Sequence, residues 1–221
     1  MNTKLKHYII MAELFEYPDD RFAEKVETVQ QFLDAHYPEA AEMLREFTAL
    51  SSRASRIEME ELFTRSFDVQ AVTTLDLGYV LFGDDYKRGE LLVNLNREHR
   101  EAENECYTEL SDHLPNVLRL LPKMQDRAIA DELVQKVISP SLNRMIKGFE
   151  PEIIEAKDKV YRKHHKTIID KSEDYYRVYQ RVLMTLYKVL KVDFQFTEYT
   201  ETEKTSDFLK SIDSEITIEG E

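Results

Sequence analysis

The sequence predicts an all-α protein that folds as a single-domain helical bundle. Apolar residues recur at steps of three and four along almost the whole chain, which is the pattern of one buried helix face. Five glycines and six prolines among 221 residues leave few tight turns to join strands. No pair of strand-like segments joined by a two-residue turn stands out and no internal repeat is visible, so neither a β nor a repeat architecture is predicted.

The first third of the chain predicts four helices with recognisable boundaries. Tyr17-Pro18 should end the first helix, Asp19 or Asp20 can cap the second, and Pro38 precedes the third. Ser55 followed by Glu58 is a capping box for the fourth. The predicted apolar faces are Leu5, Tyr8, Ile9, Ala12 and Phe15; Phe22, Val26, Val29 and Leu33; Met43, Leu44, Phe47 and Leu50; and Met59, Leu62 and Phe63.

The middle third predicts a loop and three further helices. Residues 67–72 are short and irregular, so we expect a loop there. Helical spacing resumes over residues 75–82 and stops at Gly83, as at a C-cap glycine. Residues 86–105 should form a long helix, and Ser111 or Asp112 can cap the next. The inward positions are Leu75, Gly78, Tyr79 and Phe82; Leu91, Leu92, Leu95 and Ala102; and Leu114, Val117, Leu118 and Leu121.

The last third predicts a kinked helix, a polar helix, a final amphipathic helix and an acidic tail. Pro140 should kink or divide the first of these, and residues 152–170 carry only a sparse apolar stripe. The apolar positions of the kinked and final helices are Leu133, Val137, Leu142 and Met145, then Tyr176, Tyr179, Leu183, Leu186 and Leu190. We therefore assign residues 1–196 to a helical domain and residues 197–221 to a flexible C-terminal tail, with a docking segment as the alternative for the tail.

The charge of the chain restricts its partners. The formal net charge is -13, of which the tail contributes -6 through eight acidic residues and two lysines. An acidic body without a dense Lys/Arg run is a poor ligand for nucleic acid or anionic lipid, whereas it would attract a basic peptide. No apolar run approaches the roughly 20 residues of a membrane span, and the N-terminus lacks a signal peptide. Since Cys106 is the only cysteine, internal disulfides are excluded, and we expect a cytoplasmic protein.

Residue patterns typical of catalysis are missing, so we predict that the chain is not an enzyme and holds no metal or cofactor. There is no phosphate-binding glycine loop and no Gly-x-Ser-x-Gly elbow. No histidine has an acidic residue three positions before it, which excludes a di-iron bundle site. The acidic neighbours of Cys106 should raise its thiol pKa. The acid–imidazole pair Asp112-His113 remains, as a structural cap or as a binding site.

Two blocks of sequence resemble a known family. The first contains Phe67-Asp68, then Thr74-Leu75-Asp76-Leu77, and then the run from Leu81 through Gly83-Asp84-Asp85-Tyr86-Lys87-Arg88-Gly89 to Leu95. The second is Glu109-Leu110-Ser111-Asp112-His113-Leu114-Pro115-Asn116-Val117-Leu118. Together with Leu14-Phe15-Glu16-Tyr17-Pro18-Asp19, they resemble the NarJ branch of the NarJ/TorD/DmsD family of redox-enzyme maturation chaperones. The resemblance spans roughly residues 5–145.

The resemblance implies a TorD-like helical chaperone for a molybdoenzyme, in the NarJ branch a nitrate reductase. Members bind the N-terminal peptide of the apo catalytic subunit until the molybdenum cofactor is inserted, and only then does the enzyme dock at the membrane or undergo export. Proteins that deliver the cofactor are further expected partners, and the chaperone itself would be a monomer or a helix-exchanged dimer.

The resemblance also assigns roles to residues. Asp112 matches the family's Asp-His pair and would bind an Arg or Lys of the peptide, with His113 contacting the peptide beside it. Leu75, Tyr79, Phe82, Leu114 and Leu118 are the candidate groove walls, with plain core positions as the alternative. Structural roles are expected for Phe67, Asp68, Gly83, Asp84, Arg88, Gly89 and Pro115, among them an Asp84–Arg88 pair and close packing at Gly89.

Two other functions fit the same sequence. The chain could be a helical adaptor that uses the same groove for another protein's amphipathic helix. It could also bind a cofactor or nucleotide directly, because helix N-termini bind anions without a sequence motif. Peptides without basic residues would be preferred in the first case, and saturable cofactor binding without peptide would mark the second.

Overall fold

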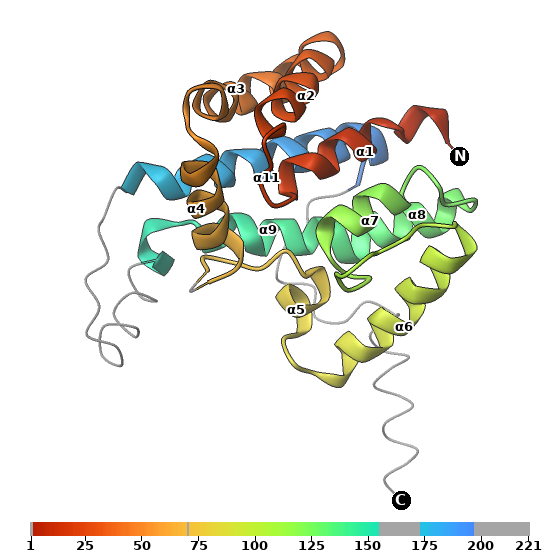
Figure 1. Ribbon diagram of the computed structural model, residues 1–221. Coiled ribbons are helices and arrows are strands. Elements are labelled where there is room, and N and C mark those ends of the chain that lie inside the picture. The colour runs from red at the N-terminus through yellow and green to blue at the C-terminus, as the bar shows by residue number, and fades with distance from the viewer. Residues whose placement is uncertain (1, 70, 155–172, 197–221) are drawn as a thin grey trace, which may run out of the picture.

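Helices dominate the computed structural model, which describes residues 2–69, 71–154 and 173–196 (Figure 1). Within these residues the only β pairing is an isolated antiparallel bridge between Asp76 and His113. The predicted all-α class is confirmed. The elements are the 3-10 helices η1 (Thr3–Leu5) and η2 (Glu13–Phe15), the π-helix η3 (Val134–Ile138), and the α-helices α1 (His7–Ala12), α2 (Phe22–His36), α3 (Pro38–Arg53), α4 (Arg56–Phe67), α5 (Leu77–Phe82), α6 (Tyr86–Glu101), α7 (Leu114–Leu120), α8 (Arg127–Leu133), α9 (Ser139–Gly148) and α11 (Glu173–Phe194).

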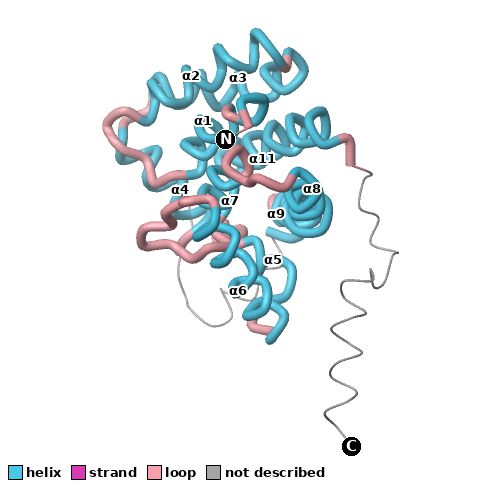
Figure 2. Tube along the Cα trace, turned by 90° about the vertical axis from the view of Figure 1, so that its right-hand side faces the viewer, coloured by secondary structure: helices cyan, strands magenta, loops and turns pink. Residues whose placement is uncertain are grey.

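Helix α11 runs through the middle of the bundle. It packs against α3 on one side and α9 on the other, while α2 covers α3 and the short α5 lies against α9 and α6 (Figures 1 and 2). Of the apolar face predicted for α11, Tyr179, Leu183, Leu186 and Leu190 are buried. The ring of Tyr179 meets those of Phe47, Phe63 and Phe67. One hydrophobic core therefore joins the N-terminal and C-terminal helices of the described chain.

A single carboxylate fastens the start of the chain to the end of α11. Asp193 lies 2.8 Å from Nε2 of His7 and accepts hydrogen bonds from the hydroxyls of Tyr8 and Tyr37, both at 2.7 Å. Burial raises the pKa of Asp193, but the hydrogen bonds with His7, Tyr37 and Tyr8 outweigh it and hold that pKa below its ordinary value. The charged form of Asp193 is therefore the form that the fold stabilises.

Several predicted helix boundaries are confirmed and three are wrong. Helix α2 begins after Arg21, and no side chain caps it, so the predicted cap by Asp19 or Asp20 is wrong. The capping box at Ser55 and Glu58 is present, with both reciprocal hydrogen bonds. Helix α6 ends at Glu101 rather than residue 105, because the chain turns at Glu103 with a φ of 50°. Helix α7 begins after His113, and neither Ser111 nor Asp112 caps it, because both side chains bond elsewhere.

The predicted kink at Pro140 takes the form of a π-helix. Residues 134–138 widen the helix just before Ser139-Pro140, and the Ser139 N–H reaches the carbonyl of Val134. A proline ring clashes with the preceding helical turn, and a π-turn is one way to make room. The predicted polar helix over 152–170 lies mostly outside the described residues, and so does the acidic segment 197–221.

Candidate functional site

The two motif blocks lie together in the fold. The bridge between Asp76 and His113 is accompanied by two backbone hydrogen bonds, from Leu77 N–H to the Asp112 carbonyl at 3.0 Å and from Leu114 N–H to the Leu75 carbonyl at 2.9 Å. Segments more than 30 positions apart therefore enter helices α5 and α7 side by side. We call the side chains of Asp76, Arg88, Asp112 and His113, with the backbone of Gly78, the motif network.

Asp112 is the buried centre of the motif network, with no exposed surface. Its Oδ2 atom accepts hydrogen bonds from the Gly78 N–H and from Nε of Arg88, both at 3.2 Å. Burial raises the pKa of Asp112 above its ordinary value, against the opposing effect of Arg88. The Arg88 guanidinium occupies the place at Asp112 that a peptide cation would take, and the predicted role of Asp112 in binding a peptide stays a prediction.

His113 and Asp76 complete the motif network nearer to the surface. Nδ1 of His113 lies 3.0 Å from Asp76 Oδ1, while Asp76 Oδ2 accepts a hydrogen bond from the Arg88 guanidinium at 3.0 Å. The hydrogen bond with His113 is the main cause that lowers the pKa of Asp76. The ring of His113 is partly accessible and its Nδ1 is engaged within the chain, so only its other edge is left for a partner.

The five predicted groove residues divide into core and surface. Leu75, Leu114 and Leu118 are fully or almost fully buried, which agrees with the core alternative for these three residues. Phe82 is partly buried against the core. Tyr79 is 43% exposed, and the Arg88 guanidinium lies 5.3 Å from its ring centroid. Tyr79 and Phe82 therefore remain as surface candidates beside the motif network.

Some of the predicted structural roles are confirmed and others are not. Gly83 ends α5 with a φ of +65°, and Pro115 lies in the first turn of α7, both as expected. Gly89 has no neighbour within 4 Å of an added Cβ, so close packing does not explain it. Arg88 pairs with Asp76 and Asp112 rather than with Asp84.

The remaining pair of structural residues closes helix α4. Phe67 is buried and its ring meets Tyr179 edge-on, with the centroids 4.8 Å apart. Asp68 is the exposed C-cap, and its N–H bonds the Thr64 carbonyl. Phe67 thus anchors the loop to the core, as expected, while the Asp68 side chain has no bond among the described residues that would fix the loop.

A second buried polar cluster was missed by the sequence analysis. Asn104 bonds Nδ1 of His99 and the carbonyl of Asn116, while the Asn116 side chain donates to the carbonyls of Cys106 and Leu110. Nε2 of His99 lies 3.0 Å from the Ser111 carbonyl. These bonds fix the loop of residues 102–113 against α6 and α7. Separate asparagines give no sequence signal for such a cluster, because their partners are backbone carbonyls brought together by the fold.

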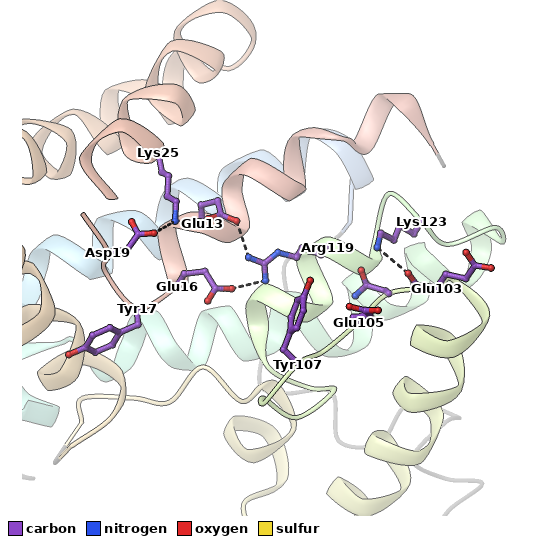
Figure 3. A pocket seen from close by; sticks show the side chains of 11 residues that line it. Glu13, Glu16, Tyr17, Asp19, Lys25, Glu103, Glu105, Tyr107, Arg119 and Lys123 are labelled. Carbon is purple, nitrogen blue, oxygen red and sulfur yellow. Dashed lines mark hydrogen bonds and ion pairs between the residues drawn. The ribbon is translucent and has the colours of Figure 1, made fainter. Parts of the chain in front are cut away.

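An acid-rich cleft of about 580 Å³ lies at this side of the molecule (Figure 3). It lies between the η2–α2 segment, the 102–113 loop and α7. Tyr17 and Tyr107 flank it with 53% and 83% of their surfaces exposed. Five acidic side chains and three cationic ones line it, which leaves a net charge of -2; they are Glu13, Glu16, Asp19, Glu103 and Glu105, with Lys25, Arg119 and Lys123.

Ion pairs occupy one half of the acid-rich cleft. Arg119 reaches Glu13 at 2.9 Å and Glu16 at 2.6 Å, and Lys25 bridges Glu13 and Asp19 (Figure 3). In the other half, Lys123 donates a hydrogen bond to the backbone carbonyl of Glu103 and forms no ion pair with a described residue. The carboxylates of Glu103 and Glu105 make no ion pair with any described residue, so two negative charges face the cleft.

Helix α7 and the loop before it connect the acid-rich cleft to the motif network. The loop carries Glu105 and Tyr107 into the cleft and ends at Asp112 and His113, after which α7 presents Arg119 to the cleft. Tyr17 and Asp19 of the cleft belong to the N-terminal motif. Residues that carry the family resemblance thus lie on both sides of this connection.

Metal-binding groups and the single cysteine were the other candidates for a site among the described residues. No group of three or more metal-binding side chains occurs in residues 2–69, 71–154 and 173–196. Burial raises the pKa of the Cys106 thiol, which disfavours a thiolate nucleophile. Among the helices that the structure describes, none has both the length and the apolar character to cross a bilayer.

Comparison of the chain with protein-family models and with curated proteins finds no match.

Proposed function

We propose that this protein is a TorD-like maturation chaperone that holds the N-terminal segment of a molybdoenzyme catalytic subunit, of the nitrate reductase type, before cofactor insertion. The acid-rich cleft is the observation that carries the proposal, since it offers unpaired carboxylates and exposed tyrosines to a basic peptide. The role requires no catalysis, so the protein would act by binding alone.

The chemistry of the acid-rich cleft suits a peptide that contains arginine or lysine. Glu103 and Glu105 can pair with cations that approach from solvent. Tyr17 and Tyr107 are exposed, and the face of such a tyrosine ring can bind a guanidinium group by a cation–π interaction. The same rings offer apolar surface against which hydrophobic side chains can pack. A peptide with basic and apolar residues would thus find partners for both.

The motif network supports the proposal in a different way. It does not contact the peptide through Asp112 but fixes the start of α7 and the end of the 102–113 loop, and these elements shape the acid-rich cleft. Asp112 would thus position the binding surface. Substitution of Asp112 would consequently reduce peptide binding by loosening the fold.

Calorimetric titration tests the proposal. A synthetic peptide of the N-terminal segment of a candidate molybdoenzyme catalytic subunit is titrated into the full chain, and micromolar binding is expected, about -8 kcal/mol. Glu103→Gln/Glu105→Gln should weaken binding by up to about thirtyfold, because the variant removes two carboxylates and each exposed ion pair contributes at most about 1 kcal/mol. Added salt should weaken binding further.

The matched control removes two charges outside the cleft. Asp68 and Glu152 are exposed carboxylates without an ion pair to any described residue, so Asp68→Asn/Glu152→Gln makes the same change in net charge. Equal weakening by both double variants would show that only net charge matters and would refute the cleft as the site. Binding of peptides irrespective of their basic residues would indicate the helical adaptor, and saturable binding of a molybdenum cofactor without peptide would indicate direct cofactor binding.

A further inference from the structure

A second groove, of about 620 Å³, has the opposite electrostatic character to the acid-rich cleft. It lies where the start of the chain, the end of α2 and the end of α11 meet, and we call it the terminal groove. No acidic side chain lines it, although the chain as a whole carries a net charge of -13. Its lining residues are Thr3, Lys4, Lys6, His7, Ile10, Phe32, His36, Tyr37 and Val192.

The floor of the terminal groove is aromatic and held in place. Phe32 stacks on the ring of His7 at a centroid distance of 5.2 Å and meets His36 at 4.7 Å. His7 and Tyr37 are both fixed by Asp193 beneath them. At the edge, Val192 has 54% of its surface exposed. The groove thus presents apolar surface that no described segment covers.

The rim of the terminal groove is cationic. Lys4 and Lys6 are exposed, and neither forms an ion pair with an acidic side chain in the described part of the chain. Asp193, the acidic group next to the lining, is already engaged by three donors. The features together suit a ligand that combines carboxylates with apolar side chains.

The chain itself contains such a ligand immediately after α11. Residues 197–221 carry eight acidic residues against two lysines. Within this segment apolar residues stand at steps of three and four, the spacing of one helix face: Phe208, Leu209, Ile212 and Ile216.

The length of the connection also fits. The described chain ends at Phe196, four residues beyond Val192 of the groove. The twelve residues from 197 to 208 can span up to about 40 Å. A tether of this length gives an effective concentration in the millimolar range, so weak contacts suffice for occupancy.

We infer that residues 197–221 bind the terminal groove of the same molecule, with apolar side chains over Phe32 and Val192 and carboxylates near Lys4 and Lys6. In this state the segment occupies the terminal groove and excludes other acidic, apolar peptides from it. The acid-rich cleft lies elsewhere and stays open, so this inference stands independently of the proposed function.

A fluorescent reporter in the full chain tests the inference. The protein contains no tryptophan, so Phe208→Trp introduces a unique indole in the segment, and Ile212→Trp provides a second, independent reporter. Acrylamide quenching measures how well the indole is shielded from solvent. We expect shielding at low salt that decreases as salt screens the rim lysines.

Charge reversal identifies the groove. Lys4→Glu/Lys6→Glu should raise the quenching constant towards that of the urea-unfolded chain. Lys87→Glu/Arg100→Glu makes the same change in net charge on α6, where neither side chain has an ion pair with a described residue, and should leave shielding intact. Lys4→Gln/Lys6→Gln should give a smaller effect in the same direction, and circular dichroism verifies that each variant is folded.

Three results would overturn the inference. Both reporters could be as accessible in the folded chain as in the unfolded chain. Charge reversal at the rim could leave quenching unchanged, which would place the segment elsewhere. Shielding could increase with protein concentration, which would show that the segment binds a second copy rather than its own groove.

Discussion

Replacing Gly78 by alanine places a methyl carbon where the motif network has no room. The added Cβ would lie 2.7 Å from Oδ2 of Asp112 and 3.1 Å from both Cγ of Arg88 and Cδ2 of Leu91. The nearest of these atoms belongs to a fully buried side chain that also accepts the Gly78 N–H. Asp112 must therefore move, and its hydrogen bonds to Gly78 and Arg88 must lengthen.

The cost can be worked from these contacts. Overpacking a tight site costs about 1–3 kcal/mol, and partial loss of a hydrogen bond to a charged group adds about 1 kcal/mol. Alanine has a higher helix propensity than glycine, which offsets at most about 1 kcal/mol of this cost, and less near the start of a helix. We expect Gly78→Ala to lower the free energy of unfolding by about 2 kcal/mol, or the melting temperature by about 4–8 °C.

Urea unfolding followed by far-UV circular dichroism measures the change, and Gly89→Ala is the matched control. Gly89 lies in α6 with open space around its Cα, so alanine there should stabilise the protein by up to about 1 kcal/mol. If Gly78→Ala is as stable as the wild type, or gains stability as Gly89→Ala does, then the tight contact with Asp112 is not as described and the motif network loses its structural role.

Three further variants probe buried polar groups. Arg88→Met should cost about 3 kcal/mol in urea unfolding, because it leaves Asp112 buried and unpaired, and adding Asp112→Asn should recover part of the loss. Asp193→Asn should cost about 2 kcal/mol at neutral pH. Because the folded-state pKa of Asp193 is lowered, this difference should disappear as the pH falls below about 4; a constant difference down to acid pH would contradict the assignment. Tyr179→Phe should stabilise the fold by about 1 kcal/mol, since the buried hydroxyl has no partner among the described residues; a loss of stability on thermal melting would show that the hydroxyl is satisfied.

Helix positions were predictable because they depend on local sequence. The three- and four-residue spacing placed the buried faces of α2 and α11, and the capping box at Ser55 depends on a residue only three positions away. Gly83 was predictable for the same reason, since a glycine after an apolar helical run marks a C-cap. Local rules also predicted the disturbance before Pro140, but not that it would be a π-helix.

The candidate site was harder to predict because its partners are distant in sequence. From the sequence, Asp112 is an acidic residue without an evident partner. In the fold it accepts a hydrogen bond from Arg88, which lies 24 positions earlier in the chain. Leu75 and Leu118 lie on predicted apolar faces, and spacing alone cannot separate a core wall from a groove wall. The acid-rich cleft combines residues from positions 13 to 123, so only the packing of α1 against α7 creates it.

The central place of α11 has a consequence for synthesis on the ribosome. Helix α3 buries its apolar face against α11, a helix that is translated some 120 residues later, and Asp193 closes the N-terminal cluster only at the end. Because synthesis proceeds at about 5–20 residues per second, the apolar face of α3 stays uncovered for on the order of ten seconds before α11 is made. During that interval the nascent chain carries exposed hydrophobic surface, so a protein proposed to shield other nascent polypeptides would itself depend on early protection from aggregation.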